Sequence, residues 1–223
     1  MSATNEASVN AVDATRNKGR RFQIKHVFFV FYGLITLYVL YRFETPFLDS
    51  QSAIWEHFAK VKWWLVPHGF AGALALFLAP LQFSTRLRQR HLWLHRRLGK
   101  LYVVSVFISA PVAVYIAIVQ GPPAIVSAAV TQAIGWILTT AVALYCIRAG
   151  NIQQHREWMI RSYPFAMVFI FTRALLAIPV IERMGELGLV TVVWTCVAAA
   201  CFIPSFVINW RKVFRREAAA ATR

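Results

Sequence analysis

Acidic residues are scarce in this sequence, which holds 9 Asp and Glu against 24 Lys and Arg and has a formal net charge of +15 at pH 7. Charged residues make up only 15% of the chain, whereas 58% of it is hydrophobic. Ordinary soluble domains carry about 25% charged residues. The scarcity of charge therefore excludes most soluble classes and indicates a membrane protein.

Cysteine is also rare, and Cys146, Cys196 and Cys201 all lie within long apolar stretches. Their spacing fits neither a disulfide framework nor a metal-binding knuckle. Cys196 and Cys201 would lie about 140° apart around a helix, so they do not share a face. We interpret all three as small buried hydrophobic residues.

The motifs of soluble enzymes are missing. The sequence contains no phosphate loop, no H-E-x-x-H pair, no dinucleotide fingerprint and no nucleophile elbow. The apolar stretches also contain no pair of carboxylates, which argues against a proton relay based on acidic residues. The sequence therefore identifies no catalytic residue and does not decide whether the protein is an enzyme.

Six apolar stretches approach the length of ~20 residues that a membrane-spanning helix needs. They lie at about residues 26–42, 63–83, 101–119, 124–147, 158–181 and 187–210. We therefore predict an all-α polytopic membrane helix bundle with about six transmembrane helices at residues 25–212. A disordered basic tail at residues 1–24 would precede it and a cytoplasmic tail at 213–223 would follow.

The basic residues concentrate on one side of the predicted membrane. They cluster before the first span, between the second and third, around the turn between the fourth and fifth, and after the sixth. By the positive-inside rule this side is cytoplasmic, which places both termini in the cytoplasm. We expect the basic excess to contact the lipid bilayer, through anionic lipid headgroups at the cytoplasmic face, rather than nucleic acid.

Two ionisable residues within the spans are candidate ligand-binding residues, because charge in hydrocarbon is costly. At ~1.5 Å per helical residue, His68 lies ~8 Å below the outer surface and Arg173 lies ~22 Å from the inner one. Both fall in the outer half of the membrane and could meet in one pocket, together with Gln132. Arg173 would suit an anionic group such as a propionate. The alternatives are ordinary helix packing for His68 and a structural pairing for Arg173.

A second candidate site lies toward the cytoplasmic side, where these polar residues gather: Gln82, His95, Arg96, Tyr102, His155 and Arg161. His95 and Tyr102 share a helical face, and so do His155 and Ser162. Neutral imidazole is a common metal ligand, so His68, His95 and His155 are candidate ligands of a haem iron. Alternatively, His95 and His155 are solvated residues of the membrane surface.

An ordered set of motifs extends over most of the chain, from about Leu65 to Phe206. It comprises HGxxG at residues 68–72, LQF at 81–83, HRxxGxxY at 95–102 and HRxWMIRS at 155–162. Together these motifs resemble a family of uncharacterised bacterial membrane proteins, known only as a domain of unknown function. The resemblance implies an integral protein of the bacterial cytoplasmic (inner) membrane and brings no established activity.

We expect an integral membrane protein that binds haem b or a quinone for redox chemistry, at a polar intramembrane site around His68 and Arg173. The histidines are also loosely similar to those of membrane dihaem cytochromes, although His68 has no histidine partner at its own depth. One alternative is a transporter or binder of a small anion or lipid, with Arg173 as the counter-charge. Another is a non-catalytic assembly or sensor subunit that contacts a partner membrane protein.

The predicted topology can be tested with a reporter protein fused after Arg216. We expect a reporter that needs the cytoplasm to be active in this fusion, because the basic residues that follow the sixth span are held inside. Activity that appears only with a periplasmic reporter would contradict the topology.

Overall fold

The computed structural model describes residues 30–49 and 51–220, and every regular element in these ranges is helical. This confirms the all-α fold class. The chain divides into two units, Met1–Leu48 and Asp49–Arg223. The predicted tail at residues 1–24 and the beginning of the predicted first span lie outside the described residues.

The first unit contains a helix at residues 30–39, which continues as a π-helical turn, η1 (Leu40–Glu44), and a 3₁₀ turn, η2 (Thr45–Leu48). Pro46 explains this change of helix type, because its nitrogen carries no hydrogen to donate to an earlier carbonyl. The hydroxyl of Thr36 donates to the carbonyl of Tyr32 at 2.8 Å. This helix occupies the described part of the predicted first span.

The second unit contains a series of helices in the order α2 (Ala53–His57), α3 (Lys62–Gln82), α4 (Thr85–Arg90), α5 (Leu92–Gln120), α6 (Pro123–Arg148), α7 (Ile152–Leu176), α8 (Pro179–Glu182) and α9 (Glu186–Ala220). Among the described residues, five helices are long and apolar enough to cross a membrane, namely α3, α5, α6, α7 and the Glu186–Trp210 part of α9. With the N-terminal helix, they confirm the predicted polytopic helix bundle.

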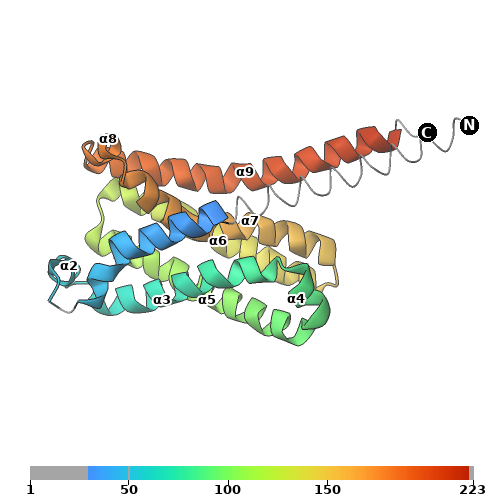
Figure 1. The fold of residues 1–223 in the computed structure, drawn as a ribbon, viewed down its shortest axis with the longest axis horizontal. Helices are drawn as coiled ribbons and strands as arrows, with labels where there is room; N and C mark the ends of the chain where they lie inside the picture. The colour runs from blue at the N-terminus through green and yellow to red at the C-terminus, as the bar shows by residue number, and fades with distance from the viewer. Residues whose placement is uncertain (1–29, 50, 221–223) are drawn as a thin grey trace, which may run out of the picture. The chain divides into compact units, whose positions relative to one another are not determined.

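The long helices of the second unit pack in chain order, with α3 on α5, α5 on α6, α6 on α7 and α7 on α9. In addition, α3 contacts α7 and α6 contacts α9. In Figure 1, α4 and the turn between α6 and α7 lie at one end of this unit, and α2 and α8 lie at the other. We call the first end the basic end, because α4 and the first turns of α5 and α7 carry most of its arginines.

Small residues allow the helices to approach closely. The buried face of α3 consists largely of Ala71, Ala75 and Ala79. On α6, Gly135 lies under the ring of Phe165 from α7, and a Cβ at this glycine would be 2.6 Å from the ring carbon Cζ. Close approach of this kind is typical of helix packing in membranes, where burial of apolar surface does not drive association.

Most hydroxyl groups within the spans are bonded to their own helix. Ser105 donates to the carbonyl of Leu101 at 2.8 Å, and Thr139 donates to that of Gly135 at 2.7 Å. Because hydrocarbon offers no partner, such local bonds let a hydroxyl lie in a membrane helix at little cost.

Two predicted boundaries differ from the structure. The predicted fifth span reached residue 181, but α7 ends at Leu176 and Pro179 begins the separate short helix α8. A proline lacks the hydrogen needed within a helix but is well suited to the first helical position, so the chain starts a new helix there. In addition, α5 begins at Leu92 rather than near residue 101, because its polar first turns remain helical outside the apolar stretch.

Replacing Gly135 with Ala should lower the free energy of unfolding by about 1–3 kcal/mol, the usual cost of overpacking. The new Cβ would overlap the Phe165 ring, which is only 3% exposed and has little room to move. The thermal unfolding midpoint in detergent measures the effect. Gly69→Ala is the matched control, since its Cβ would meet nothing within 4 Å. An equal loss in both variants would contradict the close packing at Gly135.

Candidate functional site

Four buried side chains from three helices form a hydrogen-bonded group, which we call the hydroxyl cluster: Tyr102 of α5, Trp136 and Thr140 of α6, and Ser162 of α7. The Tyr102 hydroxyl is 2.7 Å from Oγ of Ser162 and accepts from Nε1 of Trp136 at 3.2 Å. Oγ of Ser162 is also 2.7 Å from Oγ1 of Thr140.

The direction of these bonds follows from the number of hydrogens available. Thr140 donates its only hydroxyl hydrogen to the carbonyl of Trp136 at 2.7 Å, so it must accept from Ser162. Ser162 then accepts from Tyr102, which in turn accepts from the Trp136 indole. Every donor in the hydroxyl cluster is therefore used, and the chain of bonds ends on a backbone carbonyl.

Two further polar side chains, Gln82 of α3 and His95 of α5, lie nearer the basic end. Gln82 is only 8% exposed and lies against Gly99, where a Cβ would be 3.3 Å from its Oε1 atom. His95 precedes Gly99 by one helical turn. Nε2 of Gln82 and Nδ1 of His95 are both buried and have no hydrogen-bond partner within the part of the chain that the structure describes. We call this place the Gln82–His95 site.

His155 of α7 belongs to the same region, because His95 interacts electrostatically with His155 as well as with Arg88 and Arg96. Nδ1 of His155 lies 2.8 Å from the carbonyl oxygen of Ala143. That nitrogen must carry the hydrogen, since a carbonyl can only accept, and Nε2 keeps its lone pair. The two helical faces predicted to carry His95 with Tyr102 and His155 with Ser162 thus do lie near each other.

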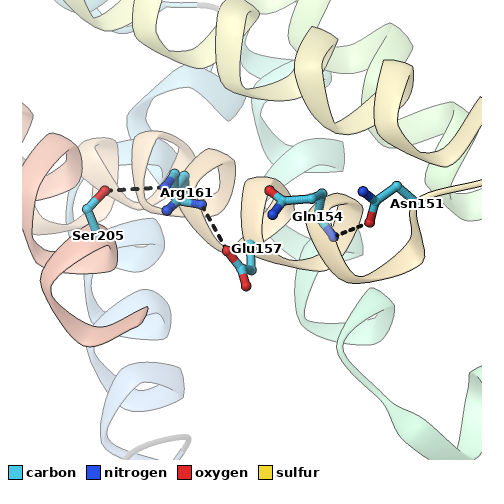
Figure 2. Close-up of polar contacts among 5 residues, drawn as sticks. All are labelled: Asn151, Gln154, Glu157, Arg161 and Ser205. Carbon is cyan, nitrogen blue, oxygen red and sulfur yellow. Dashed lines mark hydrogen bonds and ion pairs between the residues drawn. The ribbon is translucent and has the colours of Figure 1, made fainter. Parts of the chain in front are cut away.

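Arg161 points toward Ser205 of α9, as Figure 2 shows. Its Nε donates to Oγ of Ser205 at 3.3 Å, and its guanidinium is 4.0 Å from a carboxylate oxygen of Glu157. It also lies over the Trp158 ring, at 4.9 Å. Arg96 is exposed on α5. The structure therefore gives Arg161 a role in joining α7 to α9, apart from the Gln82–His95 site.

The residues predicted to share an outer site have separate partners. Nδ1 of His68 lies 3.0 Å from the carbonyl of Ser109 on α5, and Oγ of Ser109 donates back to the carbonyl of His68 at 3.3 Å. Gln132 donates to the carbonyl of Phe165 at 3.1 Å. Arg173 lies over the ring of Phe169, at 5.5 Å. No contact described for His68 or Gln132 involves Arg173, so their common pocket stays a prediction.

Several partners were not recognised from the sequence, namely Ser109, Trp136, Thr140 and Ser205. Their residue types do not indicate a bond to another helix, because hydroxyl and indole side chains in spans usually bond within their own helix or pack. Glu157 was also missed, although an acidic residue four positions before Arg161 is a recognisable helical pair.

The sequence profile of a family described as a predicted membrane protein family, DUF2306, matches residues 65–211, which is more than half of the chain. This confirms the resemblance seen in the ordered motifs. No curated protein and no solved structure matches the chain.

Tyr102→Phe should lower the free energy of unfolding by about 1–2 kcal/mol, because the Trp136 indole then loses its acceptor and the Ser162 hydroxyl loses its donor. Unfolding in detergent, followed by Trp fluorescence, measures the loss. Tyr115→Phe is the control, since Tyr115 is 41% exposed and its ring packs on Trp64 at 5.1 Å. A loss as large in Tyr115→Phe would show that any removed hydroxyl has this effect.

Proposed function

We propose that this chain, which belongs to the DUF2306 family of integral membrane proteins, binds a quinone at the Gln82–His95 site. The quinone would take part in membrane redox chemistry. The proposal rests on two buried nitrogen atoms, Nε2 of Gln82 and Nδ1 of His95, that have no hydrogen-bond partner among the described residues. Buried polar atoms are nearly always hydrogen-bonded, and all four side chains of the hydroxyl cluster meet that requirement. The two nitrogen atoms at Gln82 and His95 could therefore bond a polar group supplied from outside the chain.

A quinone meets the chemical demands of this site. Its carbonyl oxygens can accept from both an amide and an imidazole nitrogen, and its flat apolar ring dissolves in the membrane. The absence of a side chain at Gly99 keeps the amide end of Gln82 against the backbone of α5, where a larger residue would displace it. The polarity of the site and its place in a membrane protein thus suit this class of ligand.

The surroundings of the site also suit reduction of a quinone, which places negative charge on its oxygens and requires protons. Arg88 and Arg96 interact electrostatically with His95, and their positive charge would stabilise an oxygen anion beside it. The basic end would therefore attract the negative charge that reduction places on the quinone oxygens.

Haem b is the second candidate, and the hydrogen bond of His155 favours it. A histidine that binds iron through Nε2 donates its other ring nitrogen to a carbonyl or carboxylate, as Nδ1 of His155 does to Ala143. His68 uses its Nδ1 in a similar way with Ser109. His95, however, lies in one region with His155. Each of these histidines comes two helical turns before the hydroxyl-cluster residue of its own helix. The haem hypothesis therefore rests on this pair.

Quinone binding can be measured as the rise in thermal unfolding midpoint of the purified protein with decylubiquinone or menadione. Gln82→Leu and His95→Leu should each raise the Kd about tenfold, the value of one lost hydrogen bond. Gln132→Leu is the matched control, because the amide of Gln132 is already bonded to Phe165. It should change stability but leave the Kd unchanged.

The visible absorption spectrum of the same samples separates the two cofactors. A Soret band that disappears in His155→Ala would establish haem in place of quinone. A colourless protein whose unfolding midpoint no quinone raises would contradict both forms of the proposal and favour a binder of small anions or lipids.

A further inference from the structure

A cleft of about 480 Å³ lies at the basic end, between the end of α3, the short helix α4 and the beginning of α5. It is lined by Leu81, Ser84, Arg86, Leu87, Arg90, His91, Leu94 and Leu98. Its volume lies within the range of about 300–1,000 Å³ that is usual for small-molecule sites. The lining combines leucines from all three helices with two arginines from α4, so it offers an apolar wall beside two positively charged residues.

The helix α4 is held in a defined position over this cleft. Oγ of Ser84 caps its first turn by accepting from the backbone nitrogen of Leu87 at 3.3 Å. The backbone nitrogen of His91 closes its last turn on the carbonyl of Leu87 at 2.8 Å. Since Arg86 and Arg90 are one helical turn apart, they lie on the same face of α4. The two arginines therefore lie side by side on α4.

Among the described residues, no acidic side chain pairs with these two arginines. None of the residues that line the cleft is acidic, and neither Arg86 nor Arg90 takes part in an ion pair within the described part of the chain. Glu157, near the beginning of α7, is engaged with Arg161. A ligand that fits this cleft must therefore be anionic at one end and apolar at the other.

We propose that the cleft is a specific site for one anionic phospholipid, with its phosphate at Arg86 and Arg90 and its upper acyl chain against the leucines. Clusters of basic residues beside membrane helices attract anionic lipid, and arginine is well suited to phosphate oxygens. A free phosphate would leave the leucine wall uncovered. An anionic phospholipid covers both parts, and it is already present at the membrane surface where α4 lies.

The cleft lies on a different side of α3 from the amide of Gln82. Gln82 and Gly99 face each other within the contact between α3 and α5, whereas their neighbours Leu81 and Leu98 line the cleft. Neighbouring residues on a helix point about 100° apart. His95 lies on α5 between His91 and Leu98 of the cleft lining, so it adjoins both sites.

The test is native mass spectrometry of the full chain in detergent, with phosphatidylglycerol and phosphatidylcholine of identical acyl chains. We expect one phosphatidylglycerol to bind in preference, and Arg86→Gln and Arg90→Gln each to weaken it about fivefold. Arg97→Gln and Arg148→Gln remove the same charge from exposed positions outside the cleft. They should leave the affinity within about twofold of the original. Thermal unfolding confirms that all four variants are folded.

Three outcomes would overturn the proposal. Equal binding of the two lipids would show that the phosphate and its charge are not recognised. Equal losses in the cleft and control variants would show general attraction to a basic surface. Complete competition by millimolar inorganic phosphate would show an anion site that does not use the leucine wall.

Discussion

A polar side chain inside a hydrocarbon layer must find its hydrogen-bond partner within the protein, and the interior of this bundle depends on that constraint. Tyr102, Thr140 and Ser162 meet it by passing one hydrogen to the next across three helices, until the chain of bonds ends on a carbonyl. These bonds tie α5, α6 and α7 together at one level. At Gln82 and His95 the same requirement is left unmet, and this contrast directs the functional proposal to that place.

Close packing makes these contacts possible. Gly135 allows the Phe165 ring to lie on the backbone of α6, and this brings α7 near enough for Ser162 to reach α6. Between α3 and α5, a Cβ at Gly72 would be in ordinary contact with the Ser109 hydroxyl, at 3.4 Å. Small residues and hydrogen bonds therefore act together, since each interhelical bond needs a nearby backbone that a larger residue would hold apart.

Positively charged residues concentrate at one end of the bundle. The basic end carries His91, His95 and His155, the arginines of α4 and the cleft between α3, α4 and α5. Arg161 and Glu157 form an ion pair there, and Arg161 also bonds Ser205 of α9. Arg88 of α4 interacts electrostatically with His95. The two proposed binding sites therefore both lie at this end.

The sequence by itself determined the helical class, the number and approximate limits of the long helices, and the family, because apolar length and ordered motifs are local properties of a chain. It also placed His95 with Tyr102, and His155 with Ser162, on shared faces, since helical periodicity is local as well. Only the tertiary structure decided which faces meet. The bonds of His68 to Ser109 and of Arg161 to Ser205 were not predictable from the sequence. The order and rotation of helices in a bundle are set by packing between residues far apart in the chain.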